Sequence, residues 1–516
     1  MPNAAHGRNQ PPILQLNPAD PLVVATRELK VGEEIGLGDL RPVETIARGH
    51  KMATKPIADG EPVRKLGQVI GVATKPIAPG QHIHTHNVEF RASTADHAIG
   101  SGRSNLPIFP EEQAATFMGI LRPDGIVATR NYIGVLTTVN CSATVARQIS
   151  DWFRMHPEEL APYPNVDGVV ALTHKDGCAG GADSEGTQLL RRTIGGYAKH
   201  ANFGAVVMIG LGCESNQLPR LIAEEGLQAG QRIQTLVMQE VGGTRKTIEA
   251  AVARIRDLLP IVNNVKRARL PAKHLVLGMQ CGGSDGFSAI TANPALGVAA
   301  DLLVQNGGTA ILSETPEIYG AEHMLLSRAV SKEVGQKLLD LLKWWEDYAD
   351  DNDGSLDNNP SPGNKAGGLT TILEKSLGAA AKGGHSDLVD VYRYAEPVTK
   401  RGFVFMDTPG YDPVSATGQV AGGANLVAFT TGRGSCYGCK PSPSIKLATN
   451  TPMYNRMSED MDINCGEILD GGASVEEMGE RIFQLLLETA SGKRSKSEEL
   501  GYGEDEFAPW HLGATF

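Results

Sequence analysis

The stretch HLVLGMQCGGSDGFSAITANPALGVAADLL, residues 274–303, contains an apolar run, a glycine-rich turn and a segment with helical spacing, in that order. The run HLVLGMQC is apolar almost throughout, as strands buried on both faces of a parallel sheet are. Asn293 and Pro294 offer an N-cap and a first helical residue ahead of regularly spaced Leu and Ala residues. The stretch therefore predicts a strand, a tight turn and a helix, which is the repeating unit of an α/β fold.

Apolar runs of the same kind recur from about residue 113 onward and alternate with segments of helical length. The runs are VDGVVALTH, AVVMIGLGC, GTAILSET, GFVFMDT and NLVAFTTG. They predict an α/β fold with Rossmann-like parallel sheets. We assign residues 113–385 to a large α/β domain and residues 386–516 to a C-terminal α/β domain. In the latter, Ser474 and Glu477 have the spacing of a capping box at a helix start.

Three segments near the N-terminus align with one another without gaps. They are ATRELKVGEEI, ATKPIADGEPV and ATKPIAPGQHI, residues 25–35, 53–63 and 73–83. Each begins with short β-type alternation, turns at its glycine and resumes with an apolar residue. The repeat predicts a small, compact β domain over residues 21–92. A tail over residues 1–20 precedes it, and a linker rich in Gly, Ser and Pro over residues 93–112 follows it.

The third repeat runs into QHIHTHN, residues 81–87, which has a histidine at every second position. On a strand, this spacing aims His82, His84 and His86 at one face of the sheet. Such a face is either a catalytic or binding site or a hydrated surface without a function. Because the other two repeats carry Glu34 and Pro62 at the position of His82, the histidines are an addition to the scaffold rather than part of its repeat.

Composition excludes several classes of function. The 516 residues predict two to four domains. A net charge of −11 and an aromatic content of 5% argue against nucleic-acid binding. The chain lacks an apolar run of about 18 residues and a signal-peptide pattern, so neither a membrane span nor secretion is expected. Seven scattered cysteines argue against a disulfide framework and favour a reducing, cytoplasmic location.

Four cysteines stand at predicted strand ends, at Cys141, Cys178, Cys213 and Cys281. Ligands of open α/β sheets bind beyond the carboxyl ends of the strands, so these thiols could converge on iron, zinc or an iron–sulfur cluster. The alternative is that each packs as a small hydrophobic side chain. Cys436 and Cys439 form a single C-x-x-C in a glycine-rich segment, and their role stays open.

Other motifs narrow the chemistry further. GLGCE follows a strand but lacks the third glycine of a dinucleotide fingerprint, and neither a P-loop nor a G-x-S-x-G elbow is present. Positively charged residues recur in glycine-rich turns, at Lys175, Lys365, Arg433 and Lys446. Their side chains are either solvated or positioned to bind a carboxylate. Three acidic residues, Asp285, Glu214 and Glu314, also follow predicted strands. Each of them either caps a helix or acts in catalysis.

Seven motifs together resemble the altronate and galactarate dehydratase family of sugar-acid hydro-lyases. They are GHK at residues 49–51, HIHTHN, THKDGC, IGLGCE, QCGGSDGFSAITANPALG, NPSPGNKAGG and TGRG. The resemblance extends from about residue 22 to near the C-terminus. It implies an SAF-type (β-clip) module joined to a large α/β catalytic region that depends on iron. The implied reaction dehydrates an aldonate, such as D-altronate, to a 2-keto-3-deoxy acid.

HIHTHN resembles the N-terminal module of altronate-type members, whereas galactarate-type members lack these histidines. The related sulfolactate sulfo-lyases carry a similar histidine strand on a separate small subunit. Galactarate dehydration and a sulfo-lyase reaction remain the alternative enzymatic hypotheses. A sugar-acid-binding protein with an inactive site is the alternative outside catalysis.

The resemblance also implies roles for individual residues. The candidate metal ligands are Cys141, Cys178, Cys213 and Cys281, holding iron as Fe²⁺ or in an iron–sulfur cluster. The candidate catalytic residues are His174, Lys365, Asp285 and His86. The candidate substrate-binding residues are His50, His84, Asn364, Arg433 and Lys446. His82 is expected to be no more than their neighbour. A sugar-acid substrate and a homo-oligomer are expected, without nucleic-acid or membrane partners.

Overall fold

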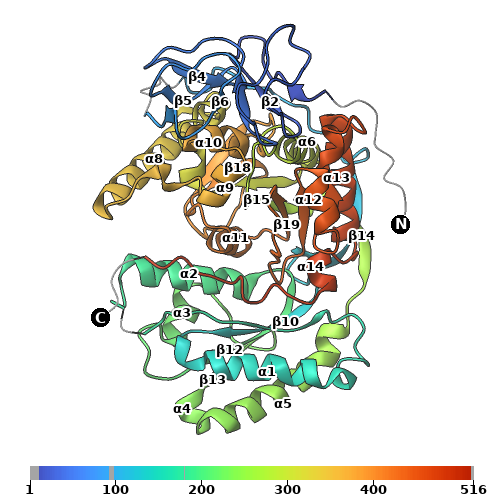
Figure 1. The fold of residues 1–516 in the computed structure, drawn as a ribbon. Helices are drawn as coiled ribbons and strands as arrows, with labels where there is room; N and C mark the ends of the chain where they lie inside the picture. Colours follow the sequence, from blue (N-terminus) through green and yellow to red (C-terminus); the bar gives the residue numbers. More distant parts are fainter. Residues whose placement is uncertain (1–10, 92–97, 179, 513–516) are drawn as a thin grey trace.

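The computed structural model describes residues 11–91, 98–178 and 180–512. Three units follow one another along the molecule (Figure 1). A small β module lies at one end, an α/β unit built on a seven-stranded sheet lies in the middle, and an α/β unit built on a four-stranded sheet lies at the other end. Within these residues, no helix is both long enough and apolar enough to cross a membrane.

The N-terminal module consists of two small antiparallel sheets. The first contains β1 (Ile13–Leu14), β2 (Leu22–Ala25), β3 (Lys51–Ala53) and β6 (His82–Ile83). The second contains β4 (Pro62–Lys65), β5 (Gln68–Ala73) and β7 (Val88–Glu89). The glycines of the three repeats, Gly32, Gly60 and Gly80, have φ angles of 73°, 77° and 86°. Only glycine adopts this conformation readily, which explains why each repeat turns there and confirms the predicted β module.

The four-stranded sheet is parallel, with strand order β11-β10-β12-β13. Its strands are β10 (Tyr132–Thr137), β11 (Gly168–Leu172), β12 (Phe203–Gly210) and β13 (Ile233–Val237). Its helices are α1 (Ala143–Met155), α2 (Glu185–Lys199), α3 (Leu218–Glu224), α4 (Met238–Val241) and α5 (Thr244–Asn263). Helices α1 and α5 pack in one hydrophobic core and α2 in another, so both faces of the sheet are covered.

A three-stranded antiparallel ribbon connects this unit to the seven-stranded sheet. It contains β8 (Thr116–Leu121), β9 (Val127–Ala128) and β14 (Arg267–Pro271). Arg130, which follows β9, is 2% exposed and forms a bidentate ion pair with Glu498, at 2.6 and 2.8 Å. The ribbon is therefore fixed to the C-terminal part of the chain by a buried, charge-assisted contact.

The seven-stranded sheet is also parallel, with order β17-β18-β16-β15-β19-β20-β21. Its strands are β15 (Val276–Cys281), β16 (Thr309–Leu312), β17 (Leu388–Tyr392), β18 (Gly402–Met406), β19 (Leu426–Thr431), β20 (Ser444–Ala448) and β21 (Ile463–Asn464). The predicted α/β fold with Rossmann-like parallel sheets is confirmed. Strands on both sides of residue 385 belong to this one sheet.

Helices cover both faces of the seven-stranded sheet (Figure 1). The longer ones are α6 (Ala292–Gln305), α8 (Lys332–Asp351), α10 (Ile372–Ala381), α11 (Asp412–Ala421) and α13 (Val475–Ala490). The shorter ones are α7 (His323–Leu326), α9 (Pro362–Ala366), α12 (Thr451–Arg456) and α14 (Lys496–Glu499). The chain passes from β15 to β16 on one side and later returns to β19 on the other side of β15. Such a switch point is where ligands bind in open α/β sheets.

Two predicted helix starts have different outcomes. At α13 the capping box is confirmed, because the Ser474 side chain accepts from Glu477 N and the Glu477 side chain accepts from Ser474 N. The expected N-cap at Asn293 is wrong. Helix α6 begins at Ala292 after Thr291, and Asn293 Nδ2 instead donates to Gly378 O at 2.9 Å. A tertiary contact to α10 has taken the side chain away from a capping role.

A buried ion-pair triad joins the N-terminal module to the seven-stranded unit. Glu374 on α10 accepts from Lys51 Nζ at 2.8 Å and from Lys65 Nζ at 2.8 Å. The exposed fractions of the three residues are 3%, 0% and 1%. Lys51 Nζ also donates to Gly368 O at 2.6 Å. Burial acts to raise the pKa of Glu374, but the two ammonium groups hold that pKa below its usual range.

We predict that Glu374→Gln destabilises the protein by about 3–5 kcal/mol, because it leaves two buried ammonium groups without their counter-charge. Calorimetry should show a lower unfolding midpoint. The matched control is Glu467→Gln, which removes an exposed pair with Arg481 and should leave the midpoint nearly unchanged. Equal midpoints for both variants would contradict a structural role for the triad.

Candidate functional site

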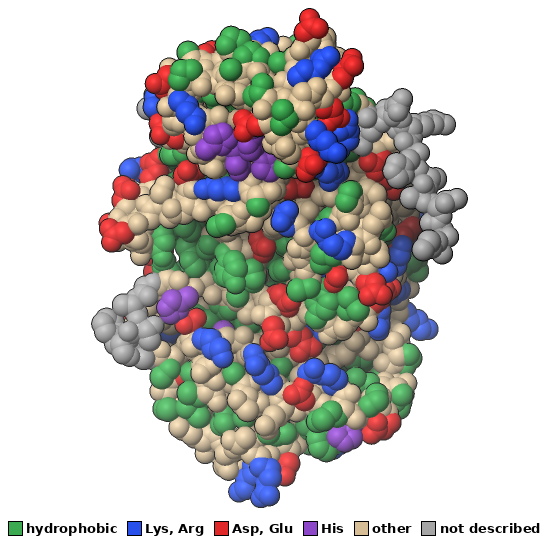
Figure 2. All heavy atoms as spheres, viewed as in Figure 1, with side chains coloured by type: hydrophobic (Ala, Val, Ile, Leu, Met, Phe, Trp, Pro, Cys, Tyr) green, Lys and Arg blue, Asp and Glu red, His purple; other side chains and the backbone are tan. Residues whose placement is uncertain are grey.

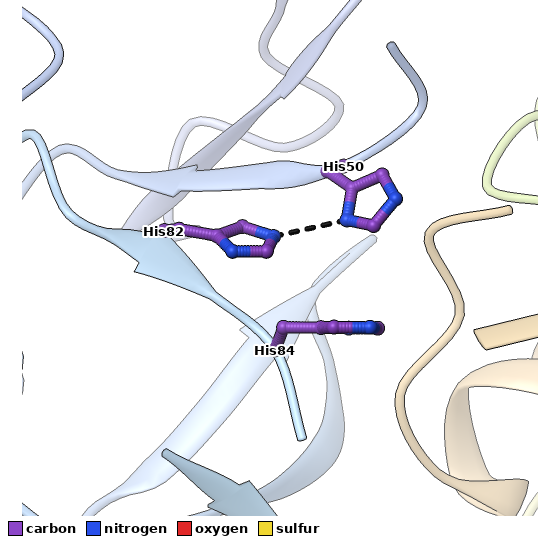
Figure 3. Close-up of side chains that lie close together, drawn as sticks. All are labelled: His50, His82 and His84. Atoms are coloured by element: carbon purple, nitrogen blue, oxygen red, sulfur yellow. Dashed lines mark hydrogen bonds between the residues drawn. The ribbon is translucent and has the colours of Figure 1, made fainter. Parts of the chain in front are cut away.

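Three histidine rings meet at the edge of the N-terminal module (Figure 3). His50 precedes β3, His82 lies on β6, and His84 follows β6. The ring centroids of His50 lie 5.0 Å from those of both His82 and His84, and the latter two are 5.3 Å apart. One ring nitrogen from each histidine lies within 4.8 Å of the other two. Figure 2 shows a patch of histidine side chains beneath the module.

The local backbone explains why His86 is not a member of this group. Strand β6 ends at Ile83, where Asn87 closes a turn: its Oδ1 accepts from His84 N and its Nδ2 donates to His82 O, both at 2.9 Å. The sequence predicted one strand with all three histidines of HIHTHN on one face. This prediction is wrong beyond Ile83, where the strand ends. His86 is exposed in the turn, with its ring centroid 5.3 Å from that of His82.

Hydrogen bonds set the tautomers of two rings. His50 Nε2 lies 3.3 Å from Ala366 O, and since a carbonyl only accepts, Nε2 carries the hydrogen. His50 Nδ1 is then the acceptor for His82 Nε2, at 2.9 Å. His84 Nδ1 is buried and has no hydrogen-bond partner among the described residues. An unpartnered buried nitrogen of this kind is available to a ligand.

Burial and neighbouring positive charge keep these rings neutral. Burial, with a smaller contribution from His50, lowers the pKa of His82 to about 3. Burial, with a contribution from Lys51, lowers the pKa of His84 to about 4. Burial also lowers the pKa of His50. Three neutral imidazoles fit a divalent transition-metal ion such as Fe²⁺ or Zn²⁺, which would replace the hydrogen bond between His50 and His82.

A second group lies beyond the carboxyl ends of β15 and β16. Cys281 Sγ is 3.6 Å from a Glu317 oxygen and 3.7 Å from a Glu314 oxygen. Lys382 Nζ donates to Glu314 at 2.9 Å, and Lys375 Nζ donates to Glu317 at 2.7 Å. Burial raises the pKa of the Cys281 thiol to about 12. Because the two ammonium groups already balance the two carboxylates, this group fits a metal ion less well than the histidines do.

A cavity of about 600 Å³ opens beside the second group. It is lined by Cys281 at the end of β15, by Glu317 in the short helix after β16 and by Asp412 at the start of α11, and α8 and the loop after it form the opposite wall. Asn364 on α9 also lines the cavity, while Ala366 of the same helix contacts His50. The histidine group and the cavity therefore adjoin the same short helix.

The four candidate thiolates are not brought together. Cys141, Cys178 and Cys213 follow strands β10, β11 and β12 of the four-stranded sheet, at the opposite end of the molecule from the histidines (Figure 1). All three are exposed, whereas Cys281 is buried in the other sheet. Among the described residues, no group of three metal-ligating side chains within 4.8 Å contains any of the first three.

Several other candidates have side chains that are bound to the protein itself. His174 Nε2 donates to Thr137 O at 2.9 Å, and His174 Nδ1 accepts from Asp176 N at 3.2 Å. Asn364 forms a capping box with Ser361 and donates to Ser284 O at 2.9 Å. These contacts hold backbone segments in place.

Asp285 and Lys446 are likewise engaged. Asp285 accepts from Thr449 Oγ1 at 3.0 Å and from Asn450 Nδ2 at 3.0 Å, and burial raises its pKa. Lys446, which is 0% exposed, donates to Tyr437 O at 3.0 Å and to Tyr502 OH at 3.1 Å. The Asp285 network therefore fixes the turns after β15 and β20 against each other.

The remaining candidates are more accessible. Lys365 is half-buried on α9, and Arg433 is exposed in the turn after β19. In the C-x-x-C segment, Cys436 is exposed and Cys439 is buried.

Sequence reasoning treated His82 as no more than a neighbour of the other histidines, and it did not single out Glu317, Lys375, Lys382 and Asp412. A signal for the two lysines was present in ILEKSLGAAAK, residues 372–382, where charged residues interrupt a segment that is otherwise apolar or small. Charged side chains on a buried helix are rare unless they are paired.

Three family models match successive parts of the chain. The altronate/galactarate dehydratase SAF domain matches residues 11–91, the D-galactarate dehydratase/altronate hydrolase second domain matches residues 119–263, and the D-galactarate/altronate dehydratase C-terminal domain matches residues 272–515.

Characterised proteins are similar over most of the chain. Altronate dehydratase of Bacillus subtilis (strain 168) is 34% identical over 498 residues, which cover 95% of this chain and 97% of that protein. Altronate dehydratase of Escherichia coli (strain K12) is 34% identical over 495 residues, with the same coverage. Galactarate dehydratase (L-threo-forming) of Escherichia coli is 40% identical over 392 residues, which cover 75% of this chain and 74% of that protein. The chain therefore belongs to the altronate and galactarate dehydratase family, with an SAF-type module ahead of its α/β region.

Proposed function

We propose that this chain dehydrates an aldonate such as D-altronate to the corresponding 2-keto-3-deoxy acid. The observation that carries the proposal is the similarity to altronate dehydratases along 95% of the chain. That similarity includes the N-terminal module, whose three grouped histidines adjoin the α/β region.

We further infer that His50, His82 and His84 hold an Fe²⁺ ion. Their neutral rings and the unpartnered His84 Nδ1 support this assignment. When bound, iron supplies a Lewis acid for the carboxylate or a hydroxyl group of the substrate. An iron–sulfur cluster on the four strand-end cysteines is the less favoured alternative, because three of them lie in a different sheet from Cys281.

The other candidate residues fall into two groups: those with accessible side chains and those whose side chains form hydrogen bonds within the protein. His86 and Lys365 are the accessible candidates near the histidine group, and they retain proposed acid–base roles. Arg433 retains a proposed role in binding the substrate's carboxylate or hydroxyls. For His174, Asn364, Asp285 and Lys446, the hydrogen bonds within the protein support a role in positioning the surrounding loops.

Galactarate is the second candidate substrate. The identity to galactarate dehydratase is 40%, against 34% for the altronate dehydratases, although it covers less of the chain. Galactarate differs from an aldonate by a second carboxylate at the far end of the molecule, so it requires a second cationic contact.

We predict that the purified protein, supplied with Fe²⁺ and a reductant, forms a 2-keto acid from D-altronate. Galactarate and sulfolactate are the comparison substrates, with sulfite release as the readout for the latter. A faster rate on galactarate would favour the second candidate. If none of the three compounds reacts, the chain is better described as a sugar-acid-binding protein.

We predict that His84→Ala loses both bound iron and turnover, because it removes one of three proposed ligands. Iron content of the full-length protein should be measured by atomic absorption alongside activity. His86→Ala should keep its iron, since His86 lies outside the group, and should lose turnover if it acts as an acid–base residue. Cys178→Ser should keep both. Loss of iron in Cys178→Ser with retention in His84→Ala would instead support the thiolate site.

A further inference from the structure

The cavity beyond β15, β16 and β18 has the location and size of a substrate chamber. It lies at the carboxyl ends of parallel strands beside the switch point of the sheet, where ligands of such folds bind. Its volume of about 600 Å³ falls within the usual range for small-molecule sites. Polar and charged residues, among them Glu317, Asn359, Lys375 and Asp412, face into it.

One side of the chamber holds an ordered carboxylate. Glu317 is 1% exposed, and its Oε1 accepts from Lys375 Nζ and from Asn359 Nδ2, both at 2.7 Å. Lys375 Nζ also donates to Asn359 Oδ1 at 2.7 Å. An ammonium group has three hydrogens, so one remains for a bound anion. Among the described residues, the second oxygen of Glu317, Oε2, accepts a hydrogen bond only from the Cys281 thiol, at 3.6 Å.

A second carboxyl group lies at the end of β15. The Asp412 Oδ2 atom is 2.1 Å from the point where a Cβ on Gly282 would stand. Any side chain at Gly282 would therefore displace Asp412, which accounts for a glycine in QCGGSDG. The chain packs Asp412 directly over the strand end that lines the chamber.

The balance of charges in this region indicates that one carboxyl group keeps its proton. Glu314, Glu317 and Asp412 supply three carboxyl groups, whereas Lys375 and Lys382 supply two ammonium groups. Buried charge is costly without a counter-charge, so one carboxyl group is expected to stay protonated. Burial raises the pKa of Glu314 to about 8 and that of Asp412 to about 7. Of these two carboxyl groups, Asp412 is the one that lines the chamber, so it is the one placed to deliver the retained proton to a substrate there.

Backbone strain gives an independent indication that this arrangement has a function. Glu314 has φ of 70°, in the left-handed region that a residue with a side chain rarely adopts. It is 0% exposed, and its Oε1 has no hydrogen-bond partner among the described residues. Strain and an unpartnered buried oxygen both cost stability, and they are typical of functional sites.

We propose that the proton transfers of the dehydration take place in this chamber rather than at His86 and Lys365, with Glu317 as the base and Asp412 as the acid. Lys375 binds the carboxylate of the sugar acid, which leaves the hydroxyls to Arg433. The proton on C2 passes reversibly to Glu317 Oε2, and the electron pair of that C–H bond is first held in the enediolate of the substrate carboxylate. It then forms the double bond between C2 and C3. The C3–O bond breaks as the hydroxyl takes the proton of Asp412 and leaves as water. The resulting enol tautomerises to the 2-keto acid, and no external oxidant or reductant is required.

This inference rests on the proposed dehydratase activity, and solvent isotope exchange tests the two separately. In D₂O, Asp412→Asn should still exchange the C2 proton of recovered substrate while kcat falls by about 10²–10⁴-fold, because only the acid is missing. Glu317→Gln should abolish both exchange and dehydration. The control is Asp350→Asn, an exposed carboxylate on α8, which should match the wild type.

Unfolding midpoints and iron content accompany each variant. If Glu317→Gln fails to fold, Asp412→Asn alone tests the inference: it should exchange the C2 proton of the substrate without eliminating water. Wild-type dehydration at unchanged kcat in Asp412→Asn, or C2 exchange in folded Glu317→Gln, would overturn this inference and leave the proposed function standing. A wild-type protein that dehydrates no sugar acid would remove both.

Discussion

The contact of Glu374 with Lys51 and Lys65 is the constraint on which the arrangement of both polar groups depends. Two buried lysines from the N-terminal module pair with one carboxylate of α10. Lys51 follows His50 directly, so this contact also sets where the histidine group stands relative to the α/β region. Close backbone packing accompanies it. A Cβ on Gly286 would lie 2.1 Å from Gly49 O, so the junction leaves no space for a side chain there.

Helix α10 connects the two polar groups electrostatically. Glu374 faces the module, while the next residue, Lys375, pairs with Glu317 at the cavity. Lys382, one residue past the helix, neutralises Glu314 behind the cavity. Each charge on this helix is buried and paired, and removing any one leaves its partner uncompensated in a medium of low polarity. The position of the module and the charge state of the cavity are therefore coupled through neighbouring residues of one rigid element.

The sequence predicted backbone features well and side-chain groupings poorly. The apolar runs located the strands, the repeat glycines located the turns of the module, and Ser474 with Glu477 located the start of α13. The cysteine hypothesis assumed that all four strand ends belong to one edge. The chain instead builds two sheets, which separates Cys281 from Cys141. His82 was undervalued because a two-residue period cannot reveal that β6 ends at Ile83 or that His50 arrives from a distant part of the chain.

The junction at Glu374 also bears on how such a protein can be assembled. Without the module, α10 would present a carboxylate to water, and the module alone would expose two lysines; each half is completed by the other. Joining the halves in one polypeptide makes their docking intramolecular, which raises the effective concentration of one half at the other. A split version on two polypeptides would have to recover that advantage by tighter association. Covalent fusion thus ensures that the histidines and the α/β region are always present in equal number.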